Sequence, residues 1–295
     1  MTATTEPTPT LFKDIAVLFK LRLGTFVVLS AVLGWFMGSS SIGLMPFLEL
    51  TIGGYLLTGA SNGFNQIIEK EADGKMGRTA NRPLPTGRMS VQTAAILSSA
   101  AGILGLLALF DLGVRAGLLG LLALTSYVLA YTPLKSKTGF SVLVGAIPGA
   151  IPPMLGYVAA TRSFGIEPGT LFAVQFMWQF PHFWAIAWVA HEDYLKAGYR
   201  MLPFQSGRSE VSARQILIYT MLCIPASLLP WALPGNAPMV GDVAFVVAIL
   251  AGIGFLIPAY RLWRNLDVKN ARQLMFASFL YLPIVQLTYV LDKTP

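Results

Sequence analysis

Residues 62–88, NGFNQIIEKEADGKMGRTANRPLPTGR, are the most densely charged segment of a chain in which 55% of the residues are hydrophobic. On an α-helix, with about 100° between successive residues, four oxygen-bearing side chains of this segment share one stripe of about 80°. They belong to Asn62, Asn65, Glu69 and Asp73. Four cations follow where glycine and proline interrupt regular helix: Lys75, Arg78, Arg82 and Arg88. Oxygen ligands beside a cationic loop suit a divalent metal ion and a phosphate, and the alternative is a solvated loop between helices.

The composition outside this segment is that of a membrane protein. The chain has 295 residues, of which 12% are charged, and its mean hydropathy is +0.63. Apolar stretches long enough to cross a bilayer are found at residues 22–40, 43–64, 91–110, 115–132, 140–160, 168–190, 214–233, 240–260 and 273–291. The sequence therefore predicts an all-α polytopic membrane protein, a bundle of nine transmembrane helices. We expect a disordered polar tail at residues 1–12, without a cleaved signal, and a single transmembrane domain at residues 13–295.

The distribution of basic residues predicts the orientation. With nine spans, all of the 21 Lys and Arg residues fall on the N-terminal side of the membrane except Arg115, Arg162 and Lys293. We therefore expect the N-terminus and the polar loops to be cytoplasmic, and the C-terminus to lie on the opposite side. The same topology accounts for the net charge of +7 without nucleic acid as a partner.

A second polar region lies near residues 175–208. If one helix runs through it, Gln175, His182 and Asp193 share one face, in a setting rich in Trp and Phe that includes Trp178. The polar segments 62–88 and 182–208 also form an approximate internal repeat, with matching Asp, Gly and Gly-Arg positions about 120 residues apart. Because four spans separate the two copies, both lie at the same membrane face, and two half-sites can face each other. Chance similarity of two polar loops is the alternative.

Two further features bear on a cavity. Residues 140–160 contain Pro148, Pro152 and Pro153, so we expect a kinked or locally unwound helix, which membranes tolerate only against protein or a cavity. A kink that serves packing alone is the alternative. Lys135 ends the preceding helix and either anchors it at the interface or points back to neutralise a phosphate.

The two half-sites together suggest a reaction. Mg²⁺ usually binds through one or two carboxylates and substrate phosphates, which fits Glu69, Asp73 and Asp193 with Asn62 and Asn65 assisting. A diphosphate can then be held between the metal and the cations. Because the surrounding cavity is expected to be apolar, the rest of that substrate should be lipid-like, as in a prenyl diphosphate.

Four short motifs occur in order along the chain: N-x-x-N-x-x-x-E-x-x-x-D with R-x-x-N-R-P-L-P at residues 62–85, YTPLK at 131–135, GAIPPMLG at 149–156, and PHFW at 181–184 followed by EDY at 192–194. Together they resemble the motifs of the UbiA superfamily of intramembrane prenyltransferases, in the variant of its haem-farnesylating branch. The resemblance covers almost the whole chain. The chain departs from related enzymes at Asn65 and Glu69, where these often have Asp, and at Glu192-Asp193, where they have paired aspartates. These departures leave one metal ion, or a loosely held second one, as alternatives.

The resemblance implies transfer of farnesyl from farnesyl diphosphate to the 2-vinyl group of haem B, with addition of water, giving haem O and diphosphate. It implies Mg²⁺ as cofactor, with catalytic and metal-binding roles for Asn62, Asn65, Glu69, Asp73 and Asp193. Diphosphate binding is expected at Lys75, Arg78, Arg82, Lys135 and Arg200, and binding of the haem acceptor at His182, Gln175 and Trp178.

The implied setting is the bilayer of a bacterial inner membrane, with haem A synthase or oxidase assembly proteins as partners. Two other functions stay open from the sequence. One is a transferase of the same superfamily that acts on a quinone precursor or another aromatic acceptor. The other is a membrane transporter, because interrupted helices and internal repeats also occur in transporters.

Overall fold

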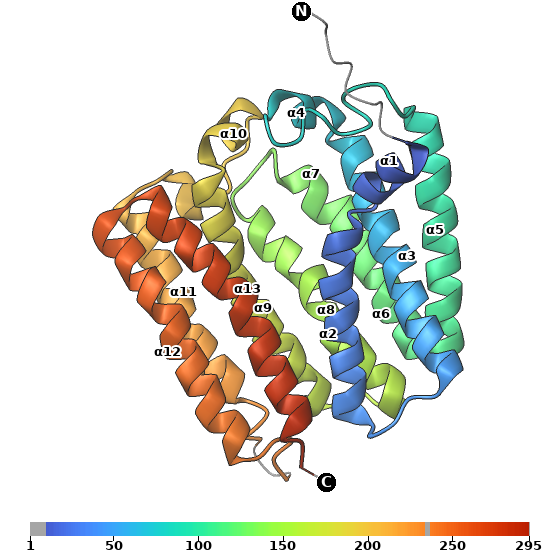
Figure 1. Cartoon of the computed structure of the whole chain (residues 1–295), viewed down its shortest axis with the longest axis vertical. Helices are drawn as coiled ribbons and strands as arrows, with labels where there is room; N and C mark the ends of the chain where they lie inside the picture. Colours follow the sequence, from blue (N-terminus) through green and yellow to red (C-terminus); the bar gives the residue numbers. More distant parts are fainter. Residues whose placement is uncertain (1–9, 234–236, 295) are drawn as a thin grey trace, which may run out of the picture.

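The computed structural model describes residues 10–233 and 237–294, and these residues form a helical bundle (Figure 1). The helices are α1 (Leu11–Leu18), α2 (Leu21–Gly38), α3 (Leu44–Ile68), α4 (Lys70–Lys75), α5 (Val91–Leu112), α6 (Val114–Thr125), the π-helix η1 (Ser126–Tyr131), α7 (Thr132–Leu134), α8 (Ser141–Thr161), α9 (Ile166–Val189), α10 (His191–Lys196), the 3-10 helix η2 (Pro203–Gln205), α11 (Glu210–Leu228), α12 (Asp242–Asn265) and α13 (Val268–Leu291). The all-α prediction is confirmed.

The protein is an integral membrane protein. Seven helices in the described part of the chain are long and apolar enough to cross a membrane, with α6, η1 and α7 counted as one span. Two more, α3 and α9, have 25 and 24 residues. These two carry the polar residues of both predicted half-sites, which accounts for their lower hydropathy. The set is compatible with nine spans, and each long helix lies within a few residues of a predicted stretch.

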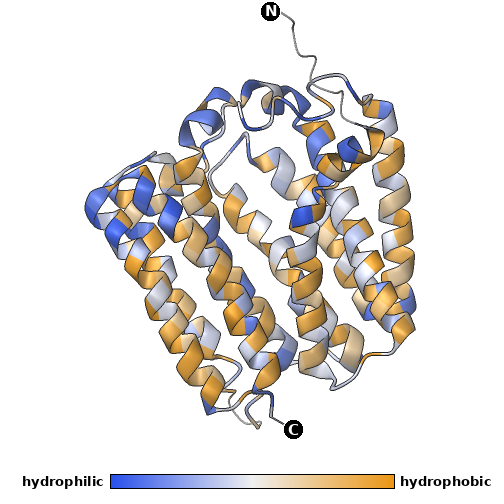
Figure 2. Ribbon diagram, in the orientation of Figure 1, coloured by the Kyte–Doolittle hydropathy of each residue, from blue (hydrophilic) through white to orange (hydrophobic). Residues whose placement is uncertain are grey.

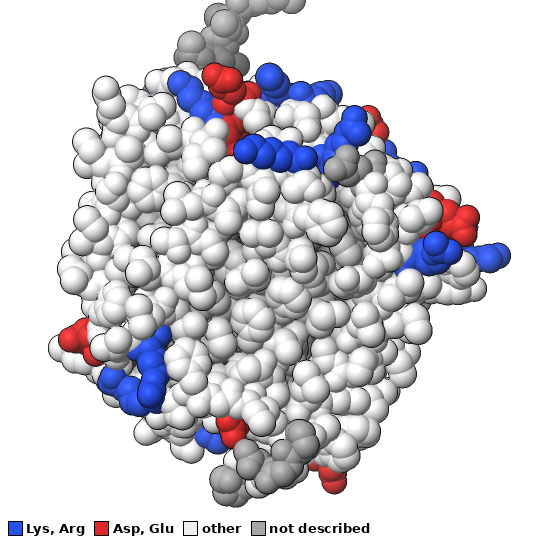
Figure 3. Space-filling view, turned by 180° about the vertical axis from the view of Figure 1, so that it is seen from behind, with Lys and Arg blue, Asp and Glu red and all other residues white. Residues whose placement is uncertain are grey.

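The long helices stand side by side, with α11–α13 on one side of the bundle, α3, α5 and α6 on the other, and α2, α8 and α9 between them (Figure 1). The short helices α1, α4 and α10 gather at one end, while α13 ends at the other. Hydrophilic residues concentrate at the end with the short helices (Figure 2). On the face in Figure 3, charged side chains lie near the two ends, and the broad band between them is uncharged.

Small residues let the central helices approach closely. A Cβ atom on Gly34 of α2 would lie 2.0 Å from the carbonyl oxygen of Pro153 on α8. A Cβ atom on Gly156 of α8 would lie 1.8 Å from the carbonyl oxygen of Ala31. Neither distance is sterically possible, so both positions require glycine for this crossing. Such contacts hold helices together in lipid, where hydrophobicity supplies no drive between them.

Helix α8 lacks the local unwinding that was one of the two forms predicted for it. Despite three internal prolines it is continuous from Ser141 to Thr161 and is not unwound. Pro153 has no N–H to donate to the carbonyl of Gly149, four residues earlier. That carbonyl instead accepts a hydrogen bond of 2.6 Å from Gln175 Nε2 on α9. The irregular backbone lies in η1, where six residues adopt π-helical geometry that the sequence did not predict.

Each predicted stripe of polar residues extends past the end of its long helix. Helix α3 stops at Ile68, so Asp73 lies on the separate short helix α4. Helix α9 stops at Val189, so Asp193 lies on α10. The predictions that one straight helix carries each stripe of polar residues are therefore wrong. The predicted tail at residues 1–12 falls mostly outside the described residues, although Leu11 and Phe12 belong to α1.

Candidate active site

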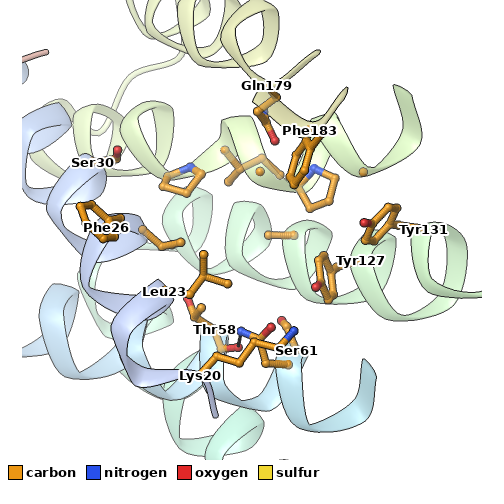
Figure 4. A pocket seen from close by; sticks show the side chains of 18 of the residues that line it. Lys20, Leu23, Phe26, Ser30, Thr58, Ser61, Tyr127, Tyr131, Gln179 and Phe183 are labelled. Atoms are coloured by element: carbon orange, nitrogen blue, oxygen red, sulfur yellow. Dashed lines mark hydrogen bonds between the residues drawn. The ribbon is translucent and has the colours of Figure 1, made fainter. Parts of the chain in front are cut away.

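A cavity of about 390 Å³ opens toward the end of the bundle with the short helices. Helices α2, α3, η1, α8 and α9 line it. In Figure 4, Tyr127 and Tyr131 lie at one end of the pocket and Phe26 at the other, while Lys20 and Gln179 face each other across it. Polar residues from α3 and α4 line part of the same cavity, and most of the remaining lining is apolar. Such a cavity can hold a ligand with a charged head and a hydrocarbon body.

Three of the predicted oxygen ligands line this cavity. The carboxylate of Asp73 is 1% exposed and lies 2.6 Å from Arg82 Nη1. The carboxylate of Glu69 is 5% exposed and lies 2.9 Å from Lys135 Nζ. Asn62 donates to the carbonyl of Thr58 through Nδ2, and its buried Oδ1 has no hydrogen-bond partner. A buried oxygen without a partner, in a cavity that two carboxylates also line, suits a ligand that supplies positive charge.

We tested this donor set against a bound Mg²⁺ ion. No group of three or more His, Cys, Asp or Glu side chains within the described ranges is arranged to hold a metal by itself. Mg²⁺ does not require such a group, because it binds through one or two carboxylates and completes its shell with water and substrate phosphates. The carboxylates of Glu69 and Asp73 and the free Oδ1 of Asn62 supply ligands of this type. These residues therefore fit a magnesium ion that enters with a phosphate-bearing substrate.

The cations of the site are held against aromatic rings. Lys135 Nζ lies 5.3 Å from the ring centre of Tyr131 and 5.5 Å from that of Tyr199. The guanidinium of Arg78 lies 4.9 Å from the ring centre of Tyr194. Burial by itself would lower the pKa of Lys135, but the neighbouring Glu69 carboxylate leaves that pKa raised, so the ammonium group stays charged. Arg78, Arg82 and Lys135 all line the cavity.

Lys20 is a fourth cation of the cavity. From the sequence, it counted only among the basic residues that predict the orientation in the membrane. It lies between α1 and α2 in the left-handed region, with φ at 48°, a conformation that costs energy in a residue other than glycine. Burial, followed by repulsion from Arg82 and Lys135, lowers its pKa to about 7. A lysine in this position gains its full charge when an anion binds. The only sequence signal is a basic residue at the cytoplasmic start of an apolar stretch, which also describes a plain membrane anchor.

Four predicted ligand residues do not line the cavity. Asn65 is buried, and its Nδ2 donates to Thr132 Oγ1 at 3.2 Å. Asp193 pairs with Lys196 at 3.5 Å, and its carboxylate faces Gly77, because the helix break at Ala190 turns α10 away from the line of α9. Lys75 and Arg200 are exposed.

All three predicted acceptor residues line the cavity, but each also holds the fold. The amide of Gln175 is used at both ends, since Oε1 accepts from Gln286 Nε2 at 2.8 Å and Nε2 donates to the carbonyl of Gly149. Trp178 Nε1 donates to the carbonyl of Ser278 at 2.8 Å. His182 stacks on Trp178 with ring centres 4.5 Å apart, and its Nδ1 lies 2.7 Å from Ser278 Oγ. Tyr194 belongs to the EDY motif but was assigned no role from the sequence, and no motif indicated Ser278 or Tyr199 as parts of the site.

Known proteins resemble this chain in sequence. Residues 23–282 match the model of the UbiA prenyltransferase family. The protoheme IX farnesyltransferase of Christiangramia forsetii is 47% identical over 288 residues, covering 98% of this chain and 96% of that protein. The protoheme IX farnesyltransferase of Flavobacterium psychrophilum is 44% identical over 293 residues, covering 98% and 97%. The chain therefore belongs to the UbiA prenyltransferase family, and its relatives named here are protoheme IX farnesyltransferases.

Solved structures agree on the fold. A structure described as giving insights into the biosynthesis of digeranylgeranylglyceryl phosphate synthase superposes with a TM-score of 0.77 at 18% identity, covering 95% of this chain and 98% of the other. A UbiA homologue from Archaeoglobus fulgidus, bound to GPP and Mg²⁺, superposes with a TM-score of 0.70 at 14% identity, covering 94% and 99%. The expected UbiA-like fold is confirmed.

Proposed function

We propose that this protein transfers a farnesyl group from farnesyl diphosphate to the 2-vinyl group of haem B, with addition of water, and releases haem O and diphosphate. The observation that carries the proposal is that one cavity has both a charged part and an apolar part. Glu69, Asp73 and four cations line its polar part, and the rest is largely apolar. The full-length likeness to protoheme IX farnesyltransferases supports haem as the acceptor.

The polar end would bind the diphosphate. Arg78, Arg82, Lys135 and Lys20 line the cavity and supply positive charge to its oxygens. Glu69, Asp73 and Asn62 would hold Mg²⁺, which when bound neutralises charge on the leaving diphosphate. In the free protein Arg82 and Lys135 pair with the two carboxylates, so both cations are already positioned when the substrate arrives. Asn65 would support η1, because it donates to Thr132 Oγ1, which donates to the carbonyl of Tyr127. Lys75, Asp193 and Arg200, which do not line the cavity, would act on the substrate only as outer charges.

The apolar part would protect the reacting carbons. Cleavage of the allylic carbon–oxygen bond leaves positive charge on the farnesyl chain, and Tyr127 and Tyr131 present aromatic rings to the cavity. Exclusion of bulk water from this part of the cavity preserves the positively charged farnesyl carbon until the vinyl group attacks it. Electrons of the vinyl double bond form the new carbon–carbon bond. Water then adds to the cation left on the haem side and loses a proton to the released diphosphate, which leaves a hydroxyl group. No protein nucleophile takes part.

Orientation and compartment belong to the same proposal. The excess of Lys and Arg at the end with α1, α4 and α10 favours a cytoplasmic position for that end, in a bacterial inner membrane. Farnesyl diphosphate then reaches the site from the cytoplasm and haem from the bilayer. Haem A synthase or an oxidase assembly protein would receive the product.

The test is product analysis with the purified protein in lipid nanodiscs. We expect haem B, farnesyl diphosphate and Mg²⁺ to yield a haem heavier by one farnesyl group and one hydroxyl group, as measured by mass spectrometry. Parallel reactions replace haem B with 4-hydroxybenzoate. Prenylation of 4-hydroxybenzoate without any change to haem would overturn the proposed acceptor.

A further inference from the structure

His182 is a buried, titratable side chain of the cavity lining that the reaction above does not use. It lies on α9, is 7% exposed and lines the cavity. Of the two histidines in the chain, the other, His191, lies on α10 near Gly207 and is not part of the cavity lining. Contacts with Trp178, Phe279 and Ser278 hold the ring of His182. The contact with Ser278 also decides which ring nitrogen carries the hydrogen.

The first contacts fix the plane of the ring. Trp178, one turn earlier on α9, stacks on the imidazole with ring centres 4.5 Å apart and planes 17° apart. Phe279 of α13 meets it edge-on, with ring centres 4.9 Å apart. Trp178 is itself tied to α13, because its Nε1 donates to the carbonyl of Ser278. The imidazole therefore has one orientation, set by two helices.

The hydroxyl of Ser278 fixes the tautomer. Ser278 Oγ lies 2.6 Å from the carbonyl oxygen of Met275 and 2.7 Å from His182 Nδ1. Two oxygens 2.6 Å apart require a hydrogen between them, and the carbonyl has none to give, so the hydroxyl donates to Met275. With its single hydrogen used, Ser278 Oγ can only accept from His182. Nδ1 therefore carries the hydrogen, and Nε2 keeps its lone pair.

Nε2 has no hydrogen-bond partner among the residues that the structure describes. Nε2 is also not among the fully buried side-chain nitrogens that lack a partner, and His182 lines the cavity. A neutral imidazole with Nδ1–H bonded to an acceptor and Nε2 free is the arrangement that metal-ligating histidines adopt, because the outer hydrogen bond orients the ring and raises its basicity. Direct proton transfer to the diphosphate is a poorer use, since the described contacts of His182 are with Trp178, Phe183, Ser278 and Phe279 and with none of the cations.

We propose that His182 Nε2 is an axial ligand for the iron of the haem acceptor, and that Ser278 is the positioning residue that presents this nitrogen. This inference rests on the proposed function, since it takes haem to be the acceptor. Coordination would anchor the porphyrin at its centre while the vinyl group at its edge meets the farnesyl chain. The bond forms from the nitrogen lone pair and needs no change of iron oxidation state.

The experiment is a titration of wild-type protein in nanodiscs with ferric haem B, followed by absorption and electron paramagnetic resonance spectra. We expect a histidine-ligated spectrum that His182→Ala abolishes. Ser278→Ala is expected to shift the spectrum and weaken haem affinity by roughly 10-fold to 100-fold, as for other outer hydrogen bonds to metal ligands. The matched control is Ser227→Ala, since Ser227 is also fully buried and donates to a carbonyl three residues earlier, Ile224, at 2.8 Å, but lies on α11 away from the cavity.

Retained binding of farnesyl diphosphate, measured on the same samples, shows that each variant is folded. If wild type binds haem and the spectra of His182→Ala and Ser278→Ala match it, the ligand assignment is overturned while the proposed function stands. If wild type binds no haem, the acceptor proposal and this inference are overturned together. Equal spectral shifts in Ser278→Ala and Ser227→Ala would overturn the positioning role of Ser278.

Discussion

The two polar segments of the chain, residues 62–88 and 182–208, contain the same structural elements in the same order. In each, a long helix ends in a break, at Glu69 or Ala190, and a helix of six residues follows. Each loop then contains a glycine with positive φ, Gly87 at 75° and Gly207 at 65°. A serine N-cap begins the next long helix in both cases. These matches support the repeat predicted from the sequence.

The two segments differ in the environment of their charges. In the first, Glu69 and Asp73 are at most 5% exposed, and each pairs with a cation that is itself less than one fifth exposed. In the second, Glu192 is 68% exposed and pairs with Arg208, and Asp193 pairs with Lys196, which is 62% exposed. Solvent screens exposed pairs, which contribute little, whereas a buried charge depends on its partner. The paired charges of the first segment are therefore held in place within the cavity, whereas those of the second lie outside its lining.

Carboxylate removal gives the largest expected contrast between the segments. We expect Glu69→Gln to lower farnesyl transfer by about 10² to 10³-fold, because it removes a cavity carboxylate and leaves Lys135 without its partner. Glu192→Gln should stay within about two-fold of wild type, since its pair with Arg208 is exposed. Steady-state rates at saturating Mg²⁺ measure both. Similar losses of rate in the two variants would show that the charges of the second segment contribute as much to farnesyl transfer as those of the first.

Cation removal gives a smaller contrast. Lys135→Met should weaken binding of farnesyl diphosphate by about 10-fold to 100-fold, the usual worth of a charged hydrogen bond in a site. Lys196→Met is the matched variant, because Lys196 also pairs with an acidic residue but is largely exposed. We expect its affinity to match wild type in calorimetric titrations. Unchanged affinity in Lys135→Met would identify that lysine as a membrane anchor, the alternative that the sequence left open.

A pH effect is the smallest prediction, and it concerns Lys20 at the first segment. Its pKa is lowered to about 7, so in the free protein it is charged below pH 7 and neutral above. Binding of a diphosphate favours the charged form, and binding above pH 7 must therefore take up a proton. Between pH 7 and 8 we expect affinity to fall by up to about ten-fold in wild type, beyond any change in Lys20→Met. Parallel pH profiles for the two proteins would contradict this role.

Much of the fold could be predicted from the sequence, because long apolar runs in a bilayer have few alternatives to helix. The polar stripe at Asn62, Glu69 and Asp73 could also be assigned to one end of the bundle, since charge is expensive within the membrane. The structure places all three at the cavity. Local periodicity was sufficient for these features.

Features that depend on contacts between distant segments could not be predicted. The prolines of α8 favoured an unwound helix, but Gln175 on another helix supplies the hydrogen bond that the Gly149 carbonyl lacks. The breaks at Glu69 and Ala190 leave no signal in the periodicity, so Asp193 was expected on the face of His182 and lies elsewhere. Ser278 reaches the site only because α13 packs against α9.

The contrast between the two segments is tested most directly by Mg²⁺-dependent binding of farnesyl diphosphate to Asp73→Asn and Asp193→Asn. These aspartates occupy corresponding positions of the two segments, but only Asp73 is buried and lines the cavity. Isothermal titration calorimetry in nanodiscs, with and without Mg²⁺, gives both affinities. We predict that Asp73→Asn loses the Mg²⁺-dependent part of the binding and that Asp193→Asn keeps most of it. An equal loss in both variants, or a larger loss in Asp193→Asn, would contradict a site preorganised by the first segment.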